Sequence, residues 1–331
     1  MKKTKTILLT IAVLLIFGAS TAIGGPIIIK LAHPNVPQHP MGQAFEYFKS
    51  MVESRSDNAI RVDIYDSSKF GNFDSVVQGL QTGMLQMGSA STPNLAPFSD
   101  DFLIFDMPFL FPSYKASDLV TDGPIGKGAS QALIKTGILG LGYIEIGFRH
   151  IFNNQRPVTK FEESKGLKIR ATSSKAHIAT LNATGMNPTP IAWGEVYTAL
   201  QQKTVDGIDI DLNLAWFNNF HEVNKNLTLV SSLYSPHLVM MSKRFYDGLD
   251  AANQILLLEA FSEMKLFERN KIRENEKMII KKMKEKGVNI VELSPEEKAR
   301  WAEATSVVYK EFEDRIGKDL IDRARKTMTA K

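Results

Sequence analysis

The 331-residue sequence contains no cysteine. Disulfides, thiol nucleophiles, thiolate metal sites and a lipid-bearing cysteine are therefore excluded. A folded chain without disulfides depends on its hydrophobic core, and this one is long enough, with 44% hydrophobic residues, to bury a sizeable core.

Several common catalytic patterns are missing as well. None of the six histidines belongs to an H-E-x-x-H pair, and the G-x-S-x-G elbow, the Walker loop and the dinucleotide glycine pattern are absent. The acids Asp206, Asp209 and Asp211 do not fit the register of an EF-hand. We therefore expect no cofactor, no resident metal and no enzyme. A secreted enzyme with Asp209 or Asp211 as base stays open as an alternative, although no matched acid or nucleophile accompanies them.

The first 22 residues have the pattern of a secretory signal peptide. A basic segment precedes an apolar run of eleven residues, Ile7 to Phe17, and small residues follow as far as Ala22. A membrane span needs about 20 residues, so an uncleaved anchor is the alternative rather than the expectation. Removal of this segment places the mature protein in the periplasm, outside the membrane, and lowers the formal charge from +4 to +1 because three lysines leave with it. Nucleic acid is therefore not an expected partner.

Strand and helix patterns alternate along the remaining chain, which predicts an α/β fold with helix-covered sheets. The expected helices are residues 43–52, 73–85, 174–183 and 193–202. The expected strands are residues 27–31, 60–65, 87–90, 137–146, 150–153, 167–171, 204–209, 227–230, 237–241 and 288–291.

Residues 251–286 contain neither proline nor glycine and are predicted to form one long helix. At 1.5 Å per residue its length is roughly 54 Å, more than the diameter of one small domain. The heptad pattern is not sustained, so a coiled coil is disfavoured. We expect the helix to lie along two lobes.

A set of short segments then occurs in a characteristic order. The segments are Leu31-Ala32-His33, His39-Pro40, Phe70-Gly71, Asp106 to Phe111, Gly147 to Asn154, Gly166 to Arg170, Pro188-Thr189-Pro190, Trp193 to Gln202 and Val205-Asp206-Gly207. Together they resemble the periplasmic solute receptors of tripartite ATP-independent periplasmic (TRAP) transporters, of the dicarboxylate-receptor family. The resemblance extends over essentially the whole mature chain.

This resemblance implies a two-lobed periplasmic binding protein fold, with a ligand cleft between the lobes and the long helix spanning both. Residues 26–148 and about 236–255 would form lobe I, and about 149–235 and about 256–331 would form lobe II. The implied partners are a small organic acid and the small and large TRAP membrane subunits, with an ion gradient driving uptake. A sensor that binds the same ligand is the alternative, and neighbouring genes would distinguish the two.

The resemblance also assigns site residues in the second lobe. Arg170 would hold the ligand carboxylate, since a guanidinium presents a planar fork of donors to two carboxylate oxygens. Arg149 would support the ligand or Arg170, Trp193 would pack on the ligand, and Ser173 could donate to it. The alternatives are a surface ion pair for Arg170, a hinge salt bridge for Arg149 and a core position for Trp193.

Four more residues are candidates for the rest of the ligand. Ser91 would line the cleft from the first lobe, and His39 would lie in a contact loop, with helix capping as its alternative role. Strand alternation puts Asp209 and Asp211 on one face, where they could accept hydrogens from a hydroxylated, sugar-acid or amino-bearing ligand, or hold a cation. Many relatives of the family have a ligand-contacting asparagine where this chain has Ile210. If Asp209 and Asp211 face the cleft, they would repel a second carboxylate, so a simple four-carbon diacid is disfavoured.

Overall fold

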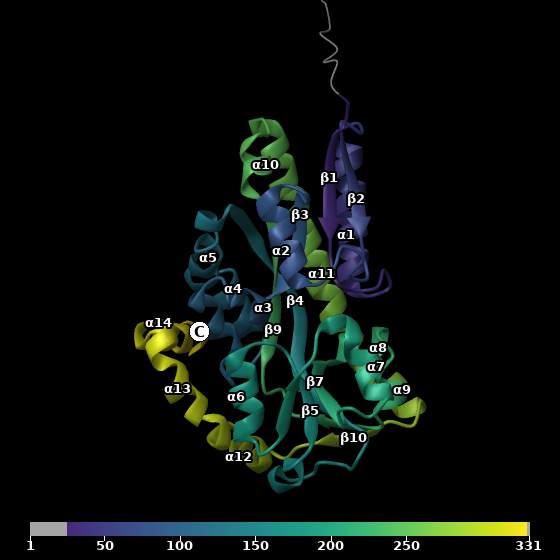
Figure 1. The fold of residues 1–331 in the computed structure, drawn as a ribbon, viewed down its shortest axis with the longest axis vertical. Coiled ribbons are helices and arrows are strands. Elements are labelled where there is room, and N and C mark those ends of the chain that lie inside the picture. The colour runs from purple at the N-terminus through teal and green to yellow at the C-terminus, as the bar shows by residue number, and fades with distance from the viewer. Residues whose placement is uncertain (1–24, 330–331) are drawn as a thin grey trace, which may run out of the picture.

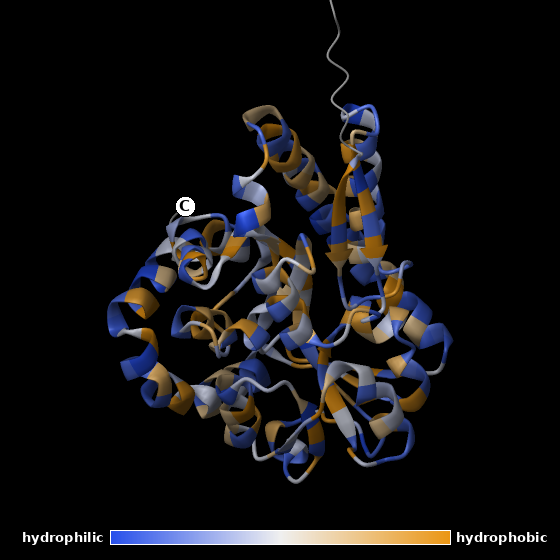
Figure 2. Cartoon of the chain, turned by 45° about the horizontal axis from the view of Figure 1, so that its top comes forward, coloured by the Kyte–Doolittle hydropathy of each residue, from blue (hydrophilic) through white to orange (hydrophobic). Residues whose placement is uncertain are grey.

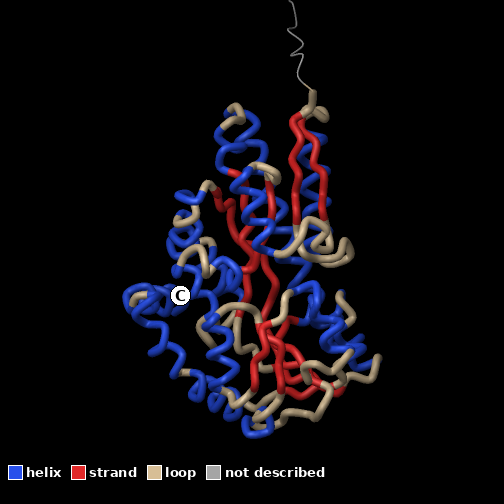
Figure 3. Tube along the Cα trace, viewed as in Figure 1, coloured by secondary structure: helices blue, strands red, loops and turns tan. Residues whose placement is uncertain are grey.

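The computed structural model describes residues 25–329, so the predicted signal peptide lies outside the described residues. Strands run through the centre of the molecule and helices lie outside them (Figures 1 and 3). No helix within residues 25–329 combines the length and the apolar character that a membrane crossing requires.

The first sheet region contains three parallel strands from the N-terminal part of the chain. They are β1 (Ile27–Ala32), β2 (Ile60–Tyr65) and β3 (Met87–Ser91), and the antiparallel β9 (Tyr234–Ser242) extends the sheet beyond β3. Apolar residues of α1 (Pro40–Arg55) and of β1 share one buried core. The predicted strands agree with these elements to within a few residues.

The second sheet region is built from later segments. Its parallel strands are β5 (Lys168–Ala171), β6 (Asn187–Pro190) and β7 (Gly207–Asp211), with β8 (Asn226–Leu229) and β10 (Asn289–Glu292) pairing at one side. All five residues of β7 are buried. A strand buried on both faces gives no sequence signal for which face meets a cleft.

Strand β4 (Ile138–Asn153) joins the two sheet regions. Its first part pairs with β9 from Ile138 to Phe148, and its last part pairs with β7 and β8 from Arg149 to Asn153. The sequence predicts two strands here, residues 137–146 and 150–153, with Gly147 between them. The backbone passes through that position with φ of 117° and an irregular register, and then continues as one strand.

The remaining short helices cover these strands. They are α2 (Phe73–Thr82), α3 (Thr92–Leu95), η1 (Asp100–Asp106), α4 (Tyr114–Thr121), α5 (Pro124–Gln131), η2 (Ile134–Thr136), η3 (Phe161–Ser164), α6 (Lys175–Ala183), η4 (Trp193–Glu195), α7 (Val196–Gln201), α8 (Leu212–Phe217), α9 (Phe220–Val223) and α10 (Lys243–Asp247). Many helices carry both blue and orange residues in Figure 2, as expected for helices with one buried and one solvated face.

The predicted long helix is confirmed as α11 (Ala251–Glu285). Its N-cap Asp250 accepts a hydrogen bond of 2.8 Å from the backbone nitrogen of Asn253. It contacts α1 in the first sheet region, β4 at the centre and α8 in the second (Figure 1). One helix therefore braces both regions against the connecting strand.

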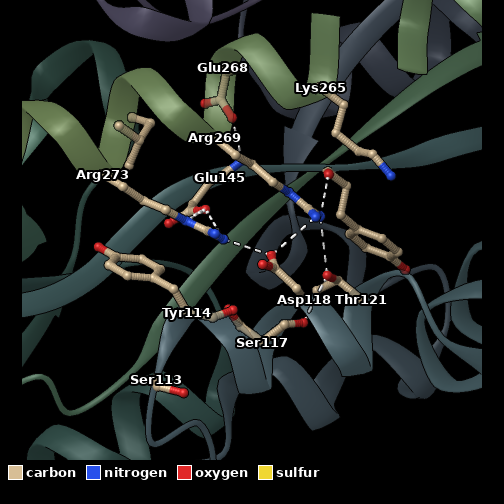
Figure 4. Close-up of polar contacts among 12 residues, drawn as sticks. Ser113, Tyr114, Ser117, Asp118, Thr121, Glu145, Lys265, Glu268, Arg269 and Arg273 are labelled. Carbon is tan, nitrogen blue, oxygen red and sulfur yellow. Dashed lines mark hydrogen bonds and ion pairs between the residues drawn. The ribbon is translucent and has the colours of Figure 1, made fainter. Parts of the chain in front are cut away.

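A partly buried ion network fastens α11 to β4 and α4 (Figure 4). Arg269, 5% exposed, reaches Asp122 at 2.7 Å and Asp118 at 3.1 Å, and donates to the carbonyl of Tyr143 at 2.9 Å. One turn later, Arg273 bridges Asp118 and the fully buried Glu145. The network links three elements that are distant in the sequence.

Three helices close the chain: α12 (Pro295–Thr305), α13 (Val307–Ile316) and α14 (Lys318–Thr329). Ser294 caps the first of them by accepting a hydrogen bond from the backbone nitrogen of Glu297. Helix α12 packs on α6, α13 on both α6 and η1, and α14 on α4. The chain thus returns from the second sheet region to helices of the first, and the predicted assignment of this segment to lobe II stays a prediction.

Candidate functional site

The two sheet regions turn the carboxyl ends of their parallel strands toward a common cavity. His33, Tyr65 and Ser89 lie at or near the ends of β1, β2 and β3, whereas Arg170 lies near the end of β5 and Ile191 follows β6. The carboxyl ends of parallel strands are the usual ligand-binding edge of open α/β sheets. The fold therefore brings polar side chains from distant segments to one place.

The cavity has two adjoining parts. We call the part beside Arg170, of about 210 Å³, the anchor compartment, and the part beside His33, of about 330 Å³, the far compartment. Four residues line both parts: Asn72, Phe73, Ala192 and Trp193. The anchor compartment is also lined by Asp74, Asn94, Arg170, Ser173, Pro190 and Ile191. The far compartment is also lined by Ala32, His33, Pro34, Tyr65, Ser68, Phe70, Gly71, Val76, Ser89, Gly194 and Glu195.

Arg170 forms one wall of the anchor compartment. It is 5% exposed, and its Nε and Nη2 atoms donate to the carbonyl oxygen of Ile191 at 3.1 and 2.9 Å. Its guanidinium carbon lies 5.9 Å from the ring centroid of Trp193. Hydrogen bonds to a carbonyl hold the fork in place without neutralising its charge.

No carboxylate within residues 25–329 forms an ion pair with Arg170. Burial and the positive charge of Arg149 together lower the pKa of Arg170 to about 9, against the opposing effect of Asp209. The guanidinium is still charged at neutral pH, and a buried charge without a counterion is costly. The site is therefore prepared for an anion supplied from outside the protein.

Arg149 and Asp209 form a buried pair behind this wall. The Arg149 Nε lies 3.3 Å from the Asp209 Oδ2, and its Nη2 also donates to the Asp209 backbone carbonyl. The backbone nitrogen of Thr172 donates to Nδ1 of His177, which leaves Nε2 to donate to the Asp209 Oδ2 at 2.9 Å. Burial favours a high pKa for Asp209, but Arg149 and His177 together hold it below the usual value.

Asp211 is also fully buried, and it caps a helix. Its Oδ1 accepts from the backbone nitrogen of Leu214 at 2.8 Å at the start of α8. Burial raises the pKa of Asp211 to about 7. Neither Asp209 nor Asp211 lines either compartment. Both carboxylates bond to other parts of the protein, and their predicted contact with the far end of a ligand stays a prediction.

Trp193 and Ser173 lie where a ligand can touch them. Trp193 lines both compartments and packs edge-on against Phe220, with ring centroids 5.7 Å apart. The hydroxyl of Ser173 lies 3.4 Å from the side-chain oxygen of Asn94, which belongs to α3 on the opposite wall. These two residues, with Arg170, are the predicted site residues that line the cavity.

Ser91 and His39 are set back from the cavity. The hydroxyl of Ser91 accepts from the Asn94 amide at 2.5 Å, so it positions a residue that lines the anchor compartment. The Nδ1 of His39 accepts from the backbone nitrogen of Met41 at 3.1 Å, which makes this fully buried histidine the N-cap of α1. Capping is the alternative role that the sequence left open for His39.

Several residues that line the cavity are not among those that the sequence predicts to contact a ligand. His33, Ser89, Asn72, Phe73 and Glu195 are the clearest cases. His33 belongs to a segment that supports the family resemblance, and Asn72 caps α2 by accepting from the Ser75 backbone nitrogen at 2.9 Å. Both signals are visible in the sequence, but neither indicates a cavity by itself.

A second hydrogen bond, besides that of Ser173 to Asn94, joins the two sheet regions. The hydroxyl of Ser174, the N-cap of α6, donates to Asp106 of η1 at 2.5 Å. Burial raises the pKa of Asp106 to about 7 despite this bond. Within the described residues, no group of three or more histidine, aspartate or glutamate side chains is arranged to hold a metal ion.

Comparisons with known proteins place the sequence in a family. Residues 31–315 match the family model described as bacterial extracellular solute-binding protein, family 7 (DctP). The chain is 33% identical over 302 residues to the C4-dicarboxylate-binding periplasmic protein DctP of Rhodobacter capsulatus, covering 91% of this chain and 90% of that protein.

Solved structures of similar proteins share the fold. The sugar acid binding protein DctPAm of Advenella mimigardefordensis, in complex with galactonate, has a TM-score of 0.89 and 29% identity, with 92% of this chain and 98% of that chain covered. A TRAP periplasmic solute binding protein of Sulfurospirillum deleyianum, with bound succinate, has a TM-score of 0.88 and 28% identity, with 92% and 100% covered. The predicted α/β fold of a periplasmic binding protein is confirmed.

Proposed function

This chain belongs to family 7 of the bacterial extracellular solute-binding proteins, and we propose that it captures a small organic acid by its carboxylate at Arg170. The family is one of binding proteins for transport rather than of enzymes. The observation that carries the proposal is the buried, unneutralised guanidinium of Arg170 at the wall of a cavity. The ligands named for the similar proteins, C4-dicarboxylates, galactonate and succinate, all present a carboxylate to such a group.

Capture is proposed to couple to closure of two lobes around the cavity. The lining residues come from both sheet regions, so a ligand that contacts both favours the closed arrangement. The bonds from Ser173 to Asn94 and from Ser174 to Asp106 are the kind of contact that closure would complete. The predicted ligand contacts of Arg149, Asp209 and Ser91 stay predictions; Arg149 pairs with Asp209, and Ser91 accepts from Asn94.

A panel of acids tests the capture directly. The unfolding temperature of the purified protein is expected to rise with cognate acids and to stay unchanged with neutral sugars of similar size, because only the acid pairs with Arg170. A ligand at 100 times its Kd adds about 2.7 kcal/mol to the free energy of unfolding, which is readily measured. Equal stabilisation by galactose and galactonate, or no stabilisation by any acid, would contradict the proposal.

The closed complex is proposed to deliver its acid to the small and large membrane subunits of a TRAP transporter in the periplasm. Family membership and the likeness to TRAP solute binding proteins support this step. Uptake of a labelled acid into proteoliposomes that contain both membrane subunits should require this protein and an ion gradient. Uptake that is equally fast without the protein would argue for a sensory role instead.

A further inference from the structure

The far compartment differs from the anchor compartment in its charge. Among the described residues that line the two parts, Arg170 is the sole arginine or lysine, and Asp74 and Glu195 are acidic. His33 is neutral at physiological pH because burial lowers its pKa to about 4. A carboxylate fits beside Arg170, but a second carboxylate in the far compartment would face Glu195 without a cation to pair with.

The far compartment nevertheless contains unused hydrogen-bonding groups. His33 is 2% exposed, its ring stacks on Phe45 at 5.1 Å, and its Nδ1 atom has no partner among the described residues. A neutral imidazole offers one donor and one acceptor, as a hydroxyl group also requires. Buried polar atoms normally have a hydrogen-bond partner, so a ligand in the cavity would supply the partner that Nδ1 lacks.

Ser89 supplies a second such group. It is fully buried in β3, and among residues 25–329 its hydroxyl donates a hydrogen bond only to the sulfur of Met41, a weak acceptor, at 3.7 Å. Tyr65 and Ser68 add further hydroxyl groups to the same compartment. The described polar residues that line only the far compartment are therefore mainly uncharged, and Glu195 is the one acidic residue among them.

We propose that the far compartment binds the hydroxyl groups of a hydroxylated monocarboxylate and rejects a second carboxylate, with His33 and Ser89 as specificity-determining residues. This inference depends on the proposed function, because it requires the carboxylate to lie at Arg170. It concerns the uncharged end of the ligand alone. It also separates this chain from relatives that are named for C4-dicarboxylates, despite the similarity of their sequences.

Calorimetric titration with four probe classes tests the selectivity. The probes are aldonates of four to six carbons, hexanoate, succinate and adipate. The tightest aldonate is expected to bind at least about 30-fold more strongly than either diacid, because the diacids leave a buried charge unpaired. Hexanoate should also bind weakly, since it leaves His33 and Ser89 without partners.

Substitution of His33 tests its role. His33→Phe keeps a ring against Phe45 but removes both nitrogens, so it should weaken aldonate binding about 10- to 100-fold and leave hexanoate binding within about threefold. His221→Phe is the matched control, because His221 is also buried and stacked on an aromatic ring, Trp216 at 4.5 Å, but lines neither compartment. Equal losses for aldonate and hexanoate would assign His33 a structural role and overturn its part in the inference.

Glu195 offers a second variant at an exposed position, where folding is less at risk. Glu195→Arg places a cation in the far compartment and should raise adipate affinity at least about tenfold. Glu222→Arg, also at an exposed position but outside the cavity, should leave the adipate affinity unchanged.

Two outcomes separate this inference from the proposed function. If the wild-type protein binds succinate as tightly as any aldonate, and Arg170→Ala binds neither ligand, then this inference fails while the proposed function stands. If no acid binds, the proposed function itself fails.

Discussion

Arg170→Ala is expected to weaken the binding of every cognate acid by about a thousandfold. The guanidinium is buried, held by the carbonyl of Ile191 and without an ion pair, so it contributes its full charge to the bound carboxylate. Removal of one partner from a buried ion pair costs roughly 3–5 kcal/mol, and each 1.4 kcal/mol corresponds to a factor of about ten. Arg170→Lys keeps the charge but loses the planar fork, so we expect it to bind with intermediate affinity.

The ligand-free stability of the same variant distinguishes a binding role from a structural one. Arg170→Ala removes an unpaired buried charge and should leave the unfolding temperature unchanged or raised. Arg156→Ala is a matched control, because exposed Arg156 also donates to backbone carbonyls, those of Glu163 and Lys165, but lies outside the cavity. Calorimetry and thermal unfolding measure both effects, and normal affinity in Arg170→Ala would overturn the assignment of the anchor.

The second large effect is expected in stability. Arg269→Met should lower the free energy of unfolding by about 3 kcal/mol, because it removes several charged hydrogen bonds between α11 and its neighbours (Figure 4). Asp122 would keep only its contact with Lys265, and the carbonyl of Tyr143 would lose its guanidinium donor. For a chain of this size the loss corresponds to a fall of roughly 10 °C in unfolding temperature.

Lys265→Met provides the matched control for this prediction. Lys265 contacts the same carboxylate at 3.1 Å, but it lies nearer to solvent, where an ion pair contributes about 0–1 kcal/mol. Chemical denaturation of both variants gives the comparison. Nearly equal stabilities for Arg269→Met and Lys265→Met would show that burial of the network adds nothing.

The sequence predicts the elements well where pattern and position agree. The long helix α11 contains no proline or glycine, Asp250 caps its start, and Gly287 follows its end. These local signals are sufficient to predict the helix. The position of Arg170 at the cavity follows from the family resemblance together with its place near a strand end. Both predictions depend on signals carried by a few neighbouring residues.

The far end of the site could not be predicted in the same way. Alternation correctly puts Asp209 and Asp211 on one face of β7, but both faces of that strand are covered by protein. Arg149 and His177 approach Asp209 from elements 60 and 32 residues away in the chain. The Asp209 carboxylate pairs with these two protein side chains because the folded elements pack together, which the sequence pattern does not reveal. His33 and Ser89 face a cavity for the same kind of reason.

The route of the chain through β4 and β9 also affects how the protein can fold. Ser89 of β3 pairs with Val239 of β9, 150 positions later, so the first sheet region is incomplete until nearly three quarters of the chain exists. Contacts of such long sequence separation slow folding. An N-terminal fragment, or either sheet region alone, lacks neighbours that its strands require. The first sheet region can therefore complete its pairing only after β9 has been synthesised, and we expect its folding to be slow and late.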